Sequence, residues 1–83
     1  MRKKLLKQGD LAVVEWIDAV SQDEWEHQDE IEIDPEHVQS VGMVYEHTKD
    51  KLTLALNHDP ANDCFSCLMC IPTGMIRSIR KLE

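Results

Sequence analysis

The alternation of leucine with smaller residues in KLTLALN, residues 51–57, is the feature that most constrains the fold. Leu52, Leu54 and Leu56 lie two positions apart, so on a strand they share one face and the intervening residues share the other. An amphipathic helix would need apolar spacings of three and four. The segment therefore predicts a strand whose leucines share one face, and such a strand needs partners to be stable.

Further runs with strand character lie on both sides of this segment. Residues 11–20 are rich in β-branched and aromatic residues, and residues 37–47 contain Gly42, which suits a bend. Residues 64–71 form a nearly continuous apolar run, which predicts a buried strand. Residues 75–82 show an apolar spacing of three, as on a helix, and a single 3₁₀ turn leading into a strand accounts for it.

The length predicts one domain that covers residues 1–83, because 83 residues are too few for two cores. A chain of this size buries about 60% of its unfolded surface, which leaves no room for a deep substrate cavity. Residues 1–10 form a basic, flexible N-terminal segment, and Gln8 interrupts its apolar stretch before it reaches signal-peptide length. We expect a cytoplasmic protein without a membrane span, since no apolar run approaches about 20 residues.

The net charge of −7 is concentrated in one part of the chain. Residues 15–36 contain ten acidic side chains and no Lys or Arg, whereas the cations cluster at the two ends. Eight of the ten fall within residues 21–36, which we call the acidic segment. A general nucleic-acid binder would carry a basic stripe, so this composition argues against direct nucleic-acid binding. The segment is either a solvated loop that aids solubility or a functional acidic face.

Three cysteines carry the strongest candidate for metal chemistry. Cys64, Cys67 and Cys70 are spaced as Cys-x-x-Cys-x-x-Cys, and His58 precedes them, which matches the ligand types of a structural zinc site. Their context is strand-like, however, and successive pairs on a strand point to opposite faces. We therefore expect buried, reduced cysteines in the core and no bound metal or other cofactor.

The order of the predicted elements resembles a small five-stranded SH3-like or Sm-like β-barrel. In this arrangement the acidic segment is the long first loop, with at most one turn of helix or one short strand, and three strands joined by short turns follow it. The resemblance rests on Cys70-Ile71-Pro72-Thr73-Gly74-Met75-Ile76-Arg77-Ser78-Ile79, because SH3-like domains place a 3₁₀ turn in an apolar-Pro-x-x-x-apolar stretch before the last strand. A mainly β protein with that 3₁₀ turn is the expected fold.

Several stretches also resemble short, uncharacterised proteins encoded in phages and prophages. These are Val14-Glu15-Trp16-Ile17-Asp18-Ala19, a following Trp25, Val41-Gly42-Met43 and the closing run from Ile71 to Ile79. The resemblance implies a bacterial host cell as the setting and favours an accessory protein that blocks or diverts a host factor, such as a defence system. It assigns no role to any residue.

The first functional hypothesis is a non-enzymatic binding protein, because no catalytic set of side chains is recognisable. Its acidic surface would engage a basic host protein, and the partner could be an enzyme that handles nucleic acid. Trp25 lies in the acidic segment and is either a lid over the core or an exposed anchor. The candidate partner-binding residues are Trp25, Asp29, Glu30, Glu32 and Asp34.

Two alternatives belong to other functional classes. One is an oligomeric sponge for a small charged ligand such as a nucleotide signal, with phosphate bound by Arg77, Arg80 and Lys81. The other is a structural subunit of a viral complex. In each case we expect a homo-oligomer, because a small barrel exposes strand edges and 42% of the residues are hydrophobic.

Overall fold

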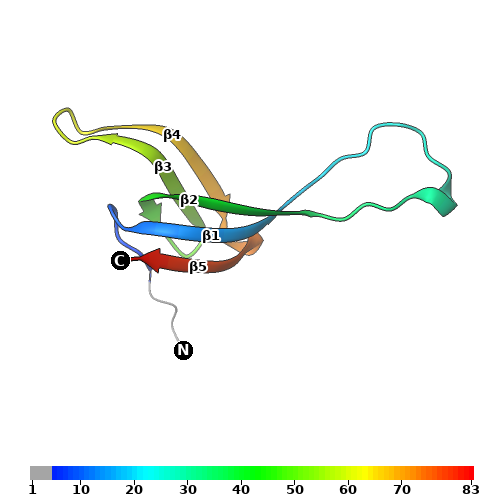
Figure 1. The fold of residues 1–83 in the computed structure, drawn as a ribbon, viewed down its shortest axis with the longest axis horizontal. Helices are drawn as coiled ribbons and strands as arrows, with labels where there is room; N and C mark the ends of the chain where they lie inside the picture. Colours follow the sequence, from blue (N-terminus) through cyan, green and yellow to red (C-terminus); the bar gives the residue numbers. More distant parts are fainter. Residues whose placement is uncertain (1–4) are drawn as a thin grey trace.

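The computed structural model describes residues 5–83, which form a single antiparallel sheet of five strands (Figure 1). The mainly β, five-stranded fold expected from the sequence is confirmed. The strands and the two 3₁₀ turns are, in chain order, β1 (Leu11–Asp18), η1 (Gln28–Glu30), β2 (Glu36–His47), β3 (Lys51–Asp59), β4 (Cys64–Pro72), η2 (Thr73–Met75) and β5 (Ile76–Leu82).

The sheet is open, with the order β4-β3-β2-β1-β5. β4 and β5 are its two edges and do not pair with each other, so the hydrogen-bonded closure of a full barrel is not present. The 3₁₀ turn expected before the last strand is η2, and the segment with helix-like spacing is the strand β5. The 3₁₀ turn ends before Ile76, and β5 contains an extra residue at Arg77 relative to β1, so the spacing of three between Ile76 and Ile79 does not require a helix.

β2 is the longest strand and pairs with different neighbours along its length. Its residues 36–43 pair with β1, whereas residues 43–47 pair with β3, with a register shift between Val44 and Glu46. Gly42 lies at the change of partner, and a Cβ at this position would stand 3.2 Å from the carbonyl oxygen of Ala55. The absence of a side chain therefore lets β3 approach β2 closely where the sheet turns.

The core lies where β1, β2 and β3 overlap. Its buried residues are Ala12, Val14, Val44, Leu52, Leu54 and Ile71, and Trp16 and Ile79 pack against them. The alternation in residues 51–57 thus predicted the inward face of β3 at Leu52 and Leu54. Leu56, the third member of that pattern, is 69% exposed, because the pairing of β3 with β2 stops at Ala55, one residue earlier.

The prediction that residues 64–71 form a buried strand is wrong as regards burial. The residues do form β4, but Ile71 is the one fully buried side chain on it, while Leu68 and Met69 are about half exposed. The physical reason is position: β4 is an edge of the sheet and has β3 as its sole neighbour. The apolar composition correctly indicated a strand, but it could not indicate whether another element packs over the side chains of that strand.

Residues 5–10 of the basic N-terminal segment contact the sheet, and residues 1–4 lie outside the described part of the chain. The backbone N–H of Leu6 donates to Nδ1 of His47 at 2.9 Å, and the N–H of Lys7 donates to the Asp10 carboxylate, also at 2.9 Å. Leu6 packs against the core. The Lys7 N–H, and more weakly Lys81, holds the pKa of Asp10 below its ordinary value.

His47 should make the stability of the fold depend on pH. Desolvation lowers its pKa below 6.5, and its Nδ1 accepts the Leu6 N–H only when that nitrogen carries no proton. A histidine whose pKa is lower in the folded state than in the unfolded state contributes stability at pH values above the unfolded-state pKa. This contribution is lost as the pH falls from about 6.5 through the lowered folded-state pKa. We expect the melting temperature to fall over this range.

Thermal melts between pH 8 and pH 5 check this expectation. His47→Asn keeps an acceptor oxygen near the Nδ1 position and removes the titration, so its melting temperature should vary less with pH over the same range. An equal decline in the two proteins would assign the pH dependence to other groups.

Candidate functional site: the acidic segment and the pocket at its base

The acidic segment extends away from the sheet between β1 and β2 (Figure 1). Every residue from 19 to 37 is exposed, and η1 is the sole regular element between the two strands. Asp29 and Glu30 lie in η1, and Glu32 and Asp34 follow it toward β2. The structure therefore places these four predicted residues on one projecting stretch of chain, fully accessible to a partner.

Trp25 lies on the same projecting stretch, with a relative exposure of 102%. This value excludes the lid over the core, because a lid would bury one face of the indole. A fully exposed tryptophan is unfavourable in water, since the side chain carries a large apolar surface. The structure thus excludes one of the two interpretations of Trp25, the lid, and the anchor stays a prediction.

The negative charge of the segment is not neutralised within the described part of the chain. The ion pairs there join Lys51 to Glu46, His58 to Asp63 and Lys81 to Asp10, and none involves residues 21–36. Carboxylates grouped without counter-charges create a local negative potential that attracts cations and basic surfaces. Because they are exposed, this potential weakens as salt is added.

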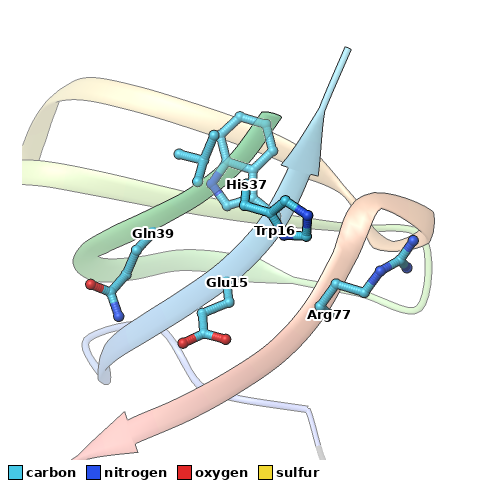
Figure 2. A pocket seen from close by; sticks show the side chains of 6 residues that line it. Glu15, Trp16, His37, Gln39 and Arg77 are labelled. Atoms are coloured by element: carbon cyan, nitrogen blue, oxygen red, sulfur yellow. The ribbon is translucent and has the colours of Figure 1, made fainter. Parts of the chain in front are cut away.

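A shallow pocket of about 300 Å³ lies at the base of the segment, where β1, β2 and β5 meet (Figure 2). It is lined by Glu15, Trp16, His37, Val38, Gln39 and Arg77. The Trp16 indole N–H donates to Oγ of Ser40 at 3.0 Å, which fixes the ring, and Glu15 accepts a hydrogen bond from the Ser78 hydroxyl at 3.3 Å.

Arg77 reaches this pocket because of an irregularity in β5. Ser78 pairs with Glu15 and Ile76 pairs with Trp16, so Arg77 is the extra residue of a bulge. Bulges redirect a side chain relative to its neighbours along the strand. Sequence reasoning singled out Arg77 for its charge, and it missed Glu15, Trp16 and His37, since no spacing in the sequence marks the bulge that brings these residues together.

The structure does not bring the three predicted phosphate ligands, Arg77, Arg80 and Lys81, together at one site. Arg80 pairs with Val13 in the β1–β5 register and is exposed, and Nζ of Lys81 lies 3.7 Å from Oδ1 of Asp10. Arg77 alone of the three lines the pocket, where it shares the space with the Glu15 carboxylate. A phosphate there would meet one cation and one anion, which weakens the case for a phosphate site within a single subunit.

The cysteine prediction is wrong in its main part, since Cys64, Cys67 and Cys70 are all exposed. The reason is again the edge position of β4. Cys64 pairs with Asp59 and Cys70 with Thr53, so the two residues lie far apart along β4. Within residues 5–83, no group of three or more metal-ligating side chains is assembled.

His58, the fourth candidate ligand, has a different environment. Its ring stacks on Phe65 with 4.1 Å between centroids, and Phe65 meets Tyr45 edge to face at 4.9 Å. Nε2 of His58 lies 3.6 Å from Oδ1 of Asp63. These contacts join the end of the β3–β4 hairpin to β2, which indicates a structural part for His58.

Comparison with protein families, with curated proteins and with solved structures finds no match to this chain. Among the described residues, no helix has the length and apolar character that crossing a membrane requires.

Proposed function

We propose that the protein is a non-enzymatic binding protein that engages a basic surface of a host protein through the acidic segment. The observation that carries this proposal is the full exposure of Trp25 on a projecting stretch whose carboxylates have no counter-charge in the described structure. A solvated loop that served only solubility would gain nothing from a large exposed indole.

The two features complement each other physically. Exposed carboxylates raise the rate of encounter with a basic partner, whereas they contribute little affinity once screened by salt. Tryptophan is among the side chains most often found as energetic anchors at interfaces, because it buries a large area at a low entropic cost. The acidic residues would therefore orient the complex, and Trp25 would hold it together.

The setting that we propose is a bacterial cell carrying a phage or prophage, with the protein acting in the cytoplasm as an accessory or anti-defence factor. The strand order and the 3₁₀ turn η2 before β5 support an open SH3-like barrel as the finer description of the fold. An enzyme that handles DNA or RNA is a suitable partner, because its basic groove would accept a row of carboxylates in place of phosphates.

Affinity capture from a bacterial host lysate tests the proposal, with the wild-type chain compared with a neutralised variant. The variant replaces Asp29 and Asp34 by Asn and Glu30 and Glu32 by Gln. We expect unchanged or slightly raised melting, because removing close like charges relieves a few tenths of a kcal/mol of repulsion per pair. We also expect slower association with the captured partner and a smaller dependence of the rate on salt.

A control variant with the same change of net charge elsewhere separates a local effect from a general one. It carries Glu46→Gln, Asp50→Asn, Asp63→Asn and Glu83→Gln. Association of the control variant should be close to that of the wild type. Unfolding of the neutralised variant, or an unchanged rate and salt dependence, would show that the acidic segment is structural or uninvolved.

A second candidate function is the binding of a small charged ligand, which the pocket between Arg77 and Trp16 favours. Stacking on an indole combined with a guanidinium is a common way to hold a nucleotide. The Glu15 carboxylate in the same pocket places this candidate second. A thermal-shift screen with nucleotides decides the matter, since a bound ligand raises the melting temperature with concentration.

A further inference from the structure

Within residues 5–83, one edge of β2 has no pairing partner over residues 36–42, beside the pocket lined by Trp16 and Arg77. Residues 36–42 pair with β1 on one side, and the pairing with β3 on the other side begins at Met43. The N–H of Val44 donates to the Asp10 carbonyl at 2.7 Å, so the backbone of Val44 points to the β1 side. Backbone groups alternate along a strand, hence those of His37, Gln39 and Val41 point away from β1.

This edge lacks the protection that the other edges of the sheet carry. Natural sheets avoid edge-to-edge pairing by placing charges, prolines or bulges on exposed strands. β5 carries Arg77, Arg80 and Lys81, and β4 ends in Pro72 and is interrupted at Cys67, which has a φ of 56°. The six residues from 37 to 42 include no charged residue (with His neutral) and no proline.

The free edge also borders an apolar groove. A hollow of about 300 Å³ lies between β2 and the β3–β4 hairpin, lined among others by Gly42, Leu56 and Met69. Val41 on the edge is 60% exposed, and Leu56 across the groove is 69% exposed. Exposed apolar side chains beside unpaired backbone groups are the two components of strand addition.

We propose that a second copy of the chain occupies this edge, with the two β2 strands antiparallel about a two-fold axis at Gln39. The backbone groups that point outward then match, since His37 meets the partner's Val41 and Gln39 meets the partner's Gln39. The pairing ends at Pro35, which would face the partner's Met43, the residue where β3 takes over the edge. A proline cannot donate to the ladder there.

The placement of the charges is compatible with this occupant in this orientation. Two copies with a net charge of −7 each repel, but Glu36 is the one acidic side chain within the paired range, and it would face the partner's Gly42, which carries no side chain. An antiparallel arrangement sends the two acidic segments away from opposite ends of the paired strands, which keeps them apart. The dimer thus covers the apolar edge and presents two copies of Trp25 to partners.

Light scattering on the full chain tests the proposal. We expect a mass of about twice 9.6 kDa at micromolar concentration. Gln39→Lys and Gln39→Glu each place two like charges opposite each other at the two-fold axis, and such pairs are destabilising. The dissociation constant of each variant's dimer should therefore be about fivefold higher than that of the wild type, or more. An equimolar mixture of the two variants should restore association, because opposite charges then face each other.

Two further measurements make the test independent of misfolding. Ser66→Lys adds the same charge to the outer strand β4 and should leave the dimer mass unchanged. Amide exchange of Gln39 and Val41 should slow as protein concentration rises. The proposal would be overturned by a monomeric wild type, by a dimer that neither Gln39 variant weakens, by failure of the mixed variants to associate, or by dissociation of Ser66→Lys. A monomer whose Gln39 amide is protected on addition of a peptide would assign the edge to a different partner.

Discussion

Leu52→Ala is expected to lower the free energy of unfolding by about 2–5 kcal/mol, the range found for truncation of fully buried leucines. Leu52 has no exposed surface and lies in the core next to Ile71, which it faces across the β3–β4 ladder. Its removal leaves a cavity that a sheet paired on both sides of β3 cannot easily close. Urea denaturation with an unchanged slope would measure the loss as a shift of the midpoint.

Leu56→Ala is the matched control, because it is the same substitution on the same strand and in the same alternating pattern. Leu56 is 69% exposed, so its truncation should change stability by about 0.5 kcal/mol or less. Equal losses at positions 52 and 56 would contradict the placement of the core. They would indicate that Leu56 is buried within the folded monomer, so the comparison is made at protein concentrations at which light scattering gives the monomer mass.

The contrast between these two leucines shows how far sequence patterns reach. Alternation in residues 51–57 correctly predicted a strand and the shared face of Leu52 and Leu54. It could not predict that Leu56 is exposed, because that depends on where β2 stops pairing with β3. The extent of a neighbouring strand is a property of the whole sheet, and no local pattern encodes it.

The same limit explains the error on the cysteines. The residues of β4 have the composition of a buried strand, and burial depends on what lies against them. With the order β4-β3-β2-β1-β5, β4 has a neighbour on one side, so Cys64, Cys67 and Cys70 are exposed. Sheet order arises from long-range pairing, which local sequence patterns do not reveal.

The candidate site also has one part that the sequence predicted and one part that it did not. The acidic segment was predictable, since the density of carboxylates between two strands leaves no apolar surface to bury except at isolated positions. The pocket was not predictable, because Arg77 enters it through a bulge and Trp16 and His37 come from strands that meet only in the folded sheet. Charge and composition are local signals, whereas a pocket requires the register of three strands.

Trp25→Ala is expected to weaken binding of the host partner by about 30-fold while leaving stability unchanged. An interfacial anchor typically contributes about 2 kcal/mol or more, and 1.4 kcal/mol corresponds to a factor of ten in the dissociation constant. The side chain is fully exposed in the free protein, so its removal creates no cavity and breaks no hydrogen bond present in the described structure. Titration against the captured partner measures the affinity, and a thermal melt measures the stability.

Trp16→Phe gives the converse control within the same chain. The Trp16 indole donates to Ser40 from a partly buried position, so its loss should cost about 1–3 kcal/mol of stability. It should leave the affinity nearly unchanged at temperatures where the variant is folded. Adding salt should slow association of the wild type and of Trp25→Ala in the same proportion, because the carboxylates that steer the encounter remain in both. Unchanged affinity on loss of Trp25 would remove the anchor from the proposed interface, and a lowered melting temperature would show that the indole is packed against the protein after all.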